Sequence, residues 1–110
     1  MNSQDVAILS KYLEENNCLE VLNLEGKFIG DKGVEVLTDA LKKNSELKSL
    51  NLCNNGISDR GAECIAQLLK TKRSGIQELN ISQNQIREKF VVSEQLQCVQ
   101  WKVLFLHKEL

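Results

Sequence analysis

The sequence lacks several features that mark common functional classes. Its 14 Lys+Arg and 15 Asp+Glu give the 110 residues a formal charge of −1, so no positive excess is available to hold nucleic acid or an anionic membrane. No apolar run approaches the roughly 18 to 20 residues that span a bilayer. The N-terminus also lacks the basic and apolar regions of a secretory signal. We therefore expect a cytoplasmic protein with neither nucleic acid nor a membrane as partner.

The residue types that perform catalysis are also scarce. The one histidine, His107, cannot complete a zinc site or a Ser-His-Asp arrangement by itself, and the sequence contains no phosphate-binding glycine loop. None of the four cysteines forms a C-x-x-C pair; they are Cys18, Cys53, Cys64 and Cys98. We expect reduced, buried thiols that act as small hydrophobic residues. The sequence predicts no enzyme, no cofactor and no metal site.

What the sequence does contain is a repeat. The pattern L-x-x-L-x-L, with Ile allowed, begins at Leu19, Leu47 and Ile76, at nearly equal intervals. Each occurrence is followed by a further aliphatic residue, at Ile29, Ile57 and Ile86. The segments between the patterns also align, with Asp31 on Asp59 and Gly33 on Gly61. A period of this length indicates a repeat architecture.

Each repeat predicts a short strand followed by an amphipathic helix. Leu22 and Leu24 are two residues apart, so they point to the same face of a strand, and Asn23 and Glu25 point to the other face. The apolar spacing then becomes helical, at Val34, Leu37 and Leu41 in one repeat and at Ala62, Ile65 and Leu69 in the next. A single unit cannot bury its apolar stripe, so the units must stack on each other.

Helix ends are predicted from polar residues. Asp31 and Asp59 stand where an N-cap acceptor is expected for the first free amides of their helices. Residues 3–18 predict the helical half of a preceding unit, which ends at Asn16-Asn17. Its inward stripe is expected to comprise Val6, Leu9, Tyr12 and Leu13.

The repeats resemble the ribonuclease-inhibitor type of leucine-rich repeat, through the segments LKSLNLCNNGI and IQELNISQNQI and the interval at which the pattern returns. The resemblance covers about residues 3–87. It implies an α/β right-handed solenoid, with a short parallel β-sheet on the concave face and helices on the convex face. It also implies that Asn55 and Asn84 turn inward and bond backbone groups between neighbouring units. Lys27 replaces the asparagine in the first unit. The hydrogen bonds that an asparagine would make there are therefore expected to be lost, and the bend is expected to open towards water.

The expected domain organisation follows from the extent of the repeats. We expect the solenoid over 1–87, divided into a half repeat 3–18, repeats 19–46 and 47–75, and a final strand and bend 76–87. A divergent apolar tail or cap follows over 88–110.

In the tail, apolar residues recur at spacings of 4 and 3 from Val92 to Leu110, which predicts a non-repeat helical segment. This helix would cover the open end of the last unit, remain partly exposed as an unrelated sequence, or provide a self-association seam over 92–110. The segment WKVLFL is also a credible strand.

The outward strand positions form columns of polar side chains when the strands stack. Such a surface suits a folded protein partner, of unknown identity. The predicted partner-binding residues are Glu20, Asn23, Glu25, Lys48, Asn51, Cys53, Gln77, Glu78 and Asn80. Among these, the three asparagines occupy a position that commonly serves the repeat structurally.

The sequence thus predicts a non-catalytic module that binds a protein through its concave face. Two alternatives remain. One is a GTPase-activating regulator, since the Ran activators resemble this repeat type. The other is a truncated isoform without independent function.

Overall fold

In the computed structural model of the chain, the leucine patterns form parallel strands. The structure describes residues 1–16, 18–71, 75–86 and 103–104. The strands are β1 (Val21–Asn23), β2 (Ser49–Asn51), β3 (Glu78–Asn80) and β4 (Val103–Leu104), and they form one sheet in the order β1-β2-β3-β4. Leu22 pairs with Leu50, and Leu50 pairs with Leu79. The predicted stacking of the three leucines is therefore confirmed.

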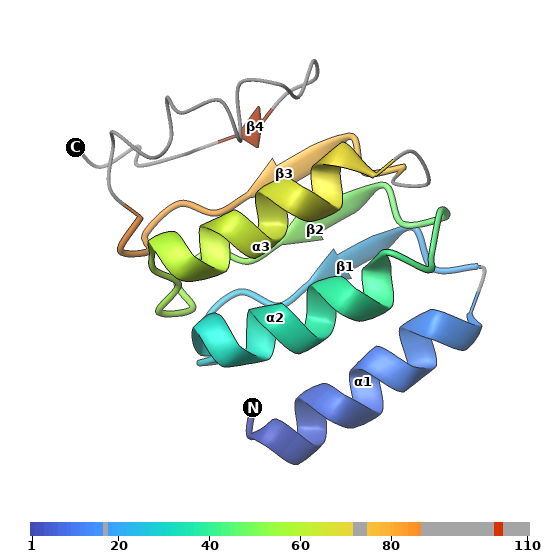
Figure 1. Cartoon of the computed structure of the whole chain (residues 1–110), viewed down its shortest axis with the longest axis horizontal. Coiled ribbons are helices and arrows are strands. Elements are labelled where there is room, and N and C mark those ends of the chain that lie inside the picture. The colour runs from blue at the N-terminus through green and yellow to red at the C-terminus, as the bar shows by residue number, and fades with distance from the viewer. Residues whose placement is uncertain (17, 72–74, 87–102, 105–110) are drawn as a thin grey trace.

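Three helices lie side by side in a layer over the sheet (Figure 1). They are α1 (Ser3–Glu15), α2 (Gly30–Leu41) and α3 (Asp59–Lys70), and α2 packs against both of the others. The predicted helical stripes face the sheet, with Val34, Leu37 and Ile65 each 0% exposed. One hydrophobic core runs between the two layers, from Leu13 in α1 to Ile86 after β3.

The first helix differs from the expectation at one residue. Val6 and Leu13 are buried as predicted, and Leu9 is half-buried, but the Tyr12 side chain is 51% exposed. Its hydroxyl accepts a hydrogen bond from Asn16 Nδ2 at 2.9 Å, one helical turn further on. The prediction that Tyr12 joins the inward stripe is wrong, because the phenol bonds along the surface of its own helix.

The predicted caps at Asp31 and Asp59 are also wrong in detail. Both residues lie in the first turn of their helices, and the N-cap positions are Ile29 and Ser58. The Asp31 carboxylate reaches the start of the next helix instead. Its Oδ1 accepts from the backbone N–H of Ser58 at 2.8 Å and of Gly61 at 3.0 Å, and its Oδ2 accepts from the Ser58 hydroxyl. Asp31 therefore caps α3 from the neighbouring unit.

The tail prediction needs correction where the structure describes it. Val103 and Leu104 form β4, which pairs in parallel with β3, Leu79 opposite Val103. A helix through these two residues is therefore wrong, and the strand alternative for WKVLFL is right there. Pairing with the edge of β3 provides backbone hydrogen bonds that a helix would otherwise supply. The rest of the predicted tail helix and the self-association seam lie outside the described residues.

Asparagine side chains connect the units, as the resemblance implied. Asn55 is 1% exposed, and its Oδ1 accepts from the backbone N–H groups of Lys27 and Ile29 at 3.0 and 3.2 Å. Its Nδ2 donates to the Leu24 carbonyl at 2.9 Å. Asn84 repeats this arrangement one unit further on, with Asn55 and Ile57 as donors. Asparagine at these positions therefore satisfies buried backbone groups that the bends would otherwise leave unpaired.

A second asparagine link joins the other ends of the helices. Asn44 is 4% exposed, and its Nδ2 donates to the carbonyls of Leu13 and Asn16 at 2.8 and 3.1 Å. Its Oδ1 accepts from Glu46 and Leu47. Asn44 is not among the residues that the sequence predicted, although it occupies the position that Asn16 holds in the preceding unit. The Asn16 side chain makes the matching bonds, because its Oδ1 accepts from the backbone N–H groups of Cys18 and Leu19.

Candidate protein-binding face

The outward side chains of the strands form the columns that the sequence predicted. Val21, Ser49 and Glu78 are register partners across three strands, and so are Asn23, Asn51 and Asn80. Neighbouring parallel strands lie about 4.8 Å apart, so each column presents its side chains at that spacing. Because α1, α2 and α3 cover the other side of the sheet (Figure 1), these columns lie on the face away from the helices.

Charged residues on this face are exposed to different degrees. Glu20, Glu25 and Glu78 are exposed, whereas Lys48 is half-buried between its neighbours. The Lys48 backbone N–H donates to the Glu20 carbonyl at 2.8 Å, and the Gln77 N–H donates to the Lys48 carbonyl at 2.7 Å. These bonds hold the column Glu20, Lys48 and Gln77 in line, with a cation in the middle.

The asparagine column has a structural role. In each strand the asparagine Oδ1 accepts from the backbone N–H two residues further on, at 3.0 Å from Asn23, 2.9 Å from Asn51 and 2.9 Å from Asn80. This bond turns the chain out of the strand and into the bend. The side-chain oxygen of each asparagine is thus already occupied, although the amide nitrogen of Asn51 also reaches Glu25 Oε1 at 3.5 Å.

Cys53 does not lie on the exposed surface. The thiol side chain is 5% exposed, and its sulfur accepts a hydrogen bond from the Ser82 hydroxyl at 3.4 Å. Cys53 follows the strand end and lies between two bends, and its short side chain does not extend beyond them. The prediction that it faces outward with Glu25 is wrong, since a partner that lies on the sheet cannot reach the thiol.

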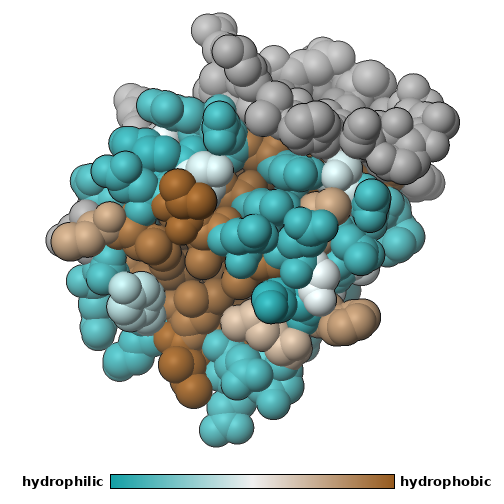
Figure 2. All heavy atoms as spheres, turned by 180° about the vertical axis from the view of Figure 1, so that it is seen from behind, coloured by the Kyte–Doolittle hydropathy of each residue, from teal (hydrophilic) through white to brown (hydrophobic). Residues whose placement is uncertain are grey.

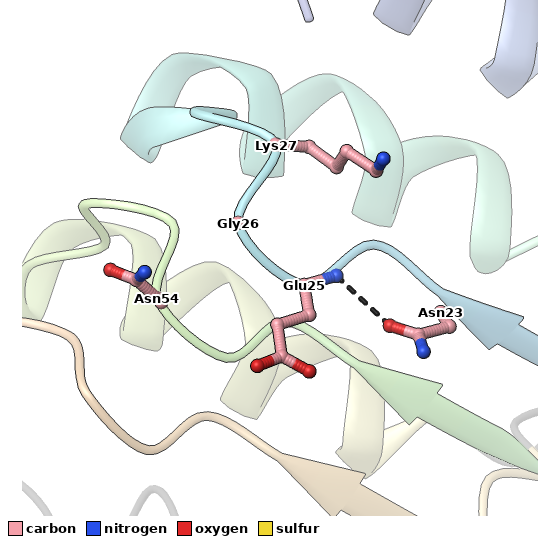
Figure 3. A pocket seen from close by; sticks show the side chains of 5 residues that line it. All are labelled: Asn23, Glu25, Gly26, Lys27 and Asn54. Carbon is pink, nitrogen blue, oxygen red and sulfur yellow. Dashed lines mark hydrogen bonds between the residues drawn. The ribbon is translucent and has the colours of Figure 1, made fainter.

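A pocket opens where β1 enters its bend (Figure 3). It has a volume of about 510 Å³ and is lined by Asn23, Glu25, Gly26, Lys27 and Asn54. The Glu25 carboxylate extends over the loop that follows β2, and the Lys27 side chain extends to the opposite side. The pocket carries one acid, one base and two amides, which suits hydrogen bonds to a polar segment of a protein.

The bend beside this pocket holds an exposed aromatic residue. Phe28 is 85% exposed and has a φ of 58°, in the left-handed region that favours glycine. The matching residue of the next repeat is Gly56, with a φ of 71°. Lys27 and Phe28 are exposed, while the backbone N–H groups of Lys27 and Ile29 donate to Asn55 of the next repeat. The Lys27 carbonyl accepts from the amino terminus of Met1 at 2.6 Å.

Within 1–16, 18–71, 75–86 and 103–104, no three His, Cys, Asp or Glu residues come together as metal ligands would. In the same part of the chain, no helix has both the length and the apolar character needed to cross a membrane.

Comparison with known proteins supports the repeat assignment. A family model described as "Leucine Rich repeat" matches residues 43–66, which run from just after α2 through β2 and into α3. A search of curated proteins finds no match.

Two solved structures have a similar fold. One is the tropomodulin C-terminal domain from Caenorhabditis elegans, with a TM-score of 0.68, 20% identity, and coverage of 87% of this chain and 55% of that one. The other is described as "Leiomodin-1 Actin-Binding Site 2", with a TM-score of 0.78, 19% identity, and coverage of 100% of this chain and 66% of that one. The chain therefore spans less than two thirds of either structure. The leucine-rich repeat match is thus limited to residues 43–66, and the two solved structures show a mixed helix and sheet fold similar to that of this chain.

Proposed function

We propose that this chain is a non-catalytic, cytoplasmic protein-interaction module of the ribonuclease-inhibitor type of leucine-rich repeat. In this proposal residues 1–87 form a short right-handed solenoid that binds a folded partner on its concave face, and residues 88–110 are a divergent apolar tail or cap. The observation that carries the proposal is the set of polar columns in register across β1, β2 and β3, on the face that the helices leave free.

Charge and burial rank the residues of this face. Glu20 and Glu78 are exposed, whereas Lys48, which lies between Glu20 and Gln77, is half-buried. A few residues dominate the energy of most interfaces, and those with a buried stem and a charged end make the stronger contacts. We therefore expect Lys48 to contribute more than the exposed Glu78, and the asparagines to contribute least because their oxygens already bond the bends.

One of the two similar structures suggests a first partner to test. The leiomodin-1 structure is described as an actin-binding site, so actin is the first purified protein to test. The binding assay compares the wild-type chain with the variants Lys48→Glu and Glu78→Lys, which reverse charge on the sheet face. Matched controls are Glu35→Lys and Gln67→Glu, which change exposed positions on α2 and α3. Circular dichroism verifies that each variant is folded.

The same variants identify other partners by capture from cell extract and mass spectrometry. The proposal predicts a partner that the wild-type chain and both helix variants capture and that both sheet variants lose. If the sheet variants still captured the partner and the helix variants did not, binding would lie on the helical side, which would contradict the proposal.

A further inference from the structure

The edge of the sheet at β1 is open to a further strand. Among the described residues, β1 pairs with β2 alone, while β2 and β3 each have neighbours on both sides. The Glu20 carbonyl accepts from Ser49 N–H at 2.9 Å, and the Leu24 N–H donates to the Asn51 carbonyl at 2.9 Å. Backbone groups alternate between the two edges of a strand. The N–H and C=O groups of Val21 and Asn23 therefore point to the open edge.

Burial at equivalent positions shows that this edge has room for apolar side chains. Leu22 is half-buried, whereas its register partners Leu50 and Leu79 are 1% and 0% exposed. Leu9 of α1 is half-buried, whereas Leu37, the equivalent residue of α2, is 0% exposed. Leu50 and Leu79 each have paired strands on both sides, whereas Leu22 has a paired strand on one side only among the described residues.

Part of the exposed apolar surface lies at the same end of the molecule. Seen from behind, hydrophobic residues form a band between hydrophilic ones that crosses the described part of the molecule from bottom to top (Figure 2). The residues of this end that remain partly or largely exposed are Met1, Ile8, Leu9, Leu19, Val21 and Leu22. An apolar patch with unpaired strand groups beside it is a template for strand addition.

The opposite edge of the sheet already holds an added strand. The two-residue strand β4 pairs in parallel with β3 outside the regular repeat, with an aliphatic residue opposite Leu79. An extended segment with aliphatic side chains thus extends this sheet without forming a complete repeat. Backbone pairing provides affinity in this mode of recognition, and alternate side chains provide specificity.

The charge at the β1 edge indicates the chemistry of the occupant. Glu20 immediately precedes β1 and Glu25 follows it by two residues, and both are exposed, as are Glu14 and Glu15 at the end of α1. Lys43 contacts Glu14 at 3.6 Å, and Lys11 and Lys27 are the exposed bases nearest in sequence to these acids. Two exposed acids therefore flank β1, and a segment with a basic residue in line with Glu20 is complementary.

We propose that the β1 edge is a second protein-binding site, which takes an extended peptide segment as a parallel strand. Apolar side chains of the segment cover Leu9 and Leu22, and a basic residue in register with Glu20 lies beside it. This site is independent of the binding face proposed above, because it uses backbone groups at the sheet edge and the apolar end of the core.

The probe is a synthetic peptide with the sequence of residues 46–53 and the change Cys53→Ser. This sequence already pairs in parallel with β1 as strand β2, and it would place a lysine beside Glu20 at the open edge. Fluorescence anisotropy of the labelled peptide measures its binding to the full chain. In the proposed register the Leu50 N–H of the peptide faces β1 and its Asn51 N–H faces away. We expect N-methylation at Leu50 to abolish binding and N-methylation at Asn51 to leave it within about twofold.

The matching protein variants are Val21→Pro and Val21→Thr. Proline removes the outward N–H at an edge position that proline tolerates, whereas threonine keeps both the N–H and the branched side chain. We expect Val21→Pro to weaken peptide binding by about twofold to tenfold, the effect of one net hydrogen bond, and Val21→Thr to bind as wild type. Thermal melting verifies that both variants fold.

Three results would overturn the proposal. One is equal binding of the two N-methylated peptides, and another is unchanged binding by a folded Val21→Pro variant. The third is a concentration-dependent dimer, measured by sedimentation, that the Val21→Pro substitution abolishes and that the peptide does not displace. The edge would then hold a second copy of the chain.

Discussion

At the scale of single residues, buried asparagines bond the backbone where the strands turn into bends. Asn55 accepts two hydrogen bonds from the preceding bend and donates two more, to Leu24 and Cys53 carbonyls. A hydrophobic residue of similar size would leave these groups without partners. The side chain therefore contributes through hydrogen bonds more than through its volume.

We expect Asn55→Ala to lower the free energy of unfolding by about 2–4 kcal/mol, because at least two buried backbone groups would lose their partners at about 1–3 kcal/mol each. Urea denaturation measures the change. The control Gln67→Ala removes an exposed amide from α3 and should change stability by less than about 0.5 kcal/mol. Equal effects of the two substitutions would contradict the role of Asn55.

A second residue-scale prediction concerns Cys64. Burial raises the pKa of its thiol, and nearby carboxylates, first Glu35 and then Glu63, raise it further. A raised pKa leaves less thiolate at pH 8, and thiolate is the reactive form. We expect iodoacetamide to modify Cys64 more slowly than the exposed Cys18, as measured by mass spectrometry of peptides.

Burial by itself would also slow the reaction of Cys64, so a variant must separate the two causes. Glu35→Gln removes an exposed charge without opening the core. We expect it to speed modification of Cys64 by about twofold to threefold, the size of a surface charge interaction. Modification at the wild-type rate would show that steric access alone controls this thiol.

At the scale of elements, each helix depends on its neighbour. Asp31 belongs to α2, yet its carboxylate accepts from the first backbone groups of α3. The close approach requires glycine at position 61, because a Cβ there would lie 2.5 Å from Asp31 Oδ1. The repeated Asp and Gly of the sequence therefore form a contact between units rather than within one.

We expect Asp31→Ala to lower the free energy of unfolding by about 1–2 kcal/mol, the usual cost of a lost cap. Circular dichroism during urea denaturation measures it. The control Asp39→Ala removes an exposed carboxylate of the same helix, which lies 3.8 Å from the Lys42 ammonium, and should cost less than about 0.5 kcal/mol. If both variants lost the same stability, Asp31 would act through general charge and not as a cap.

At the scale of the whole molecule, burial is greatest in the middle of the stack. Leu50 and Leu22 occupy the same register position, but Leu50 has strands on both sides and is 1% exposed, whereas Leu22 is half-buried. One core connects α1 to the bend after β3. Stability should therefore depend on position in the stack and not on residue type alone.

We expect Leu50→Ala to cost about 2–5 kcal/mol and Leu22→Ala about 1–2 kcal/mol, because the second change removes less buried apolar surface and leaves a smaller cavity. Urea denaturation compares the two variants. If Leu50→Ala does not fold, the pair Leu50→Val and Leu22→Val preserves the comparison. Equal losses at the two positions would contradict the open edge at β1.

The sequence alone determined the repeat, the strand and helix of each unit, and the leucine register, because local periodicity fixes which side chains share a face. The tertiary structure decided what depends on neighbours in space. It placed Asp31 on the next helix, buried Cys53 between two bends, exposed Tyr12, and put Val103 and Leu104 in a strand. Periodicity describes one unit at a time, and these features arise from the packing and hydrogen bonding between units.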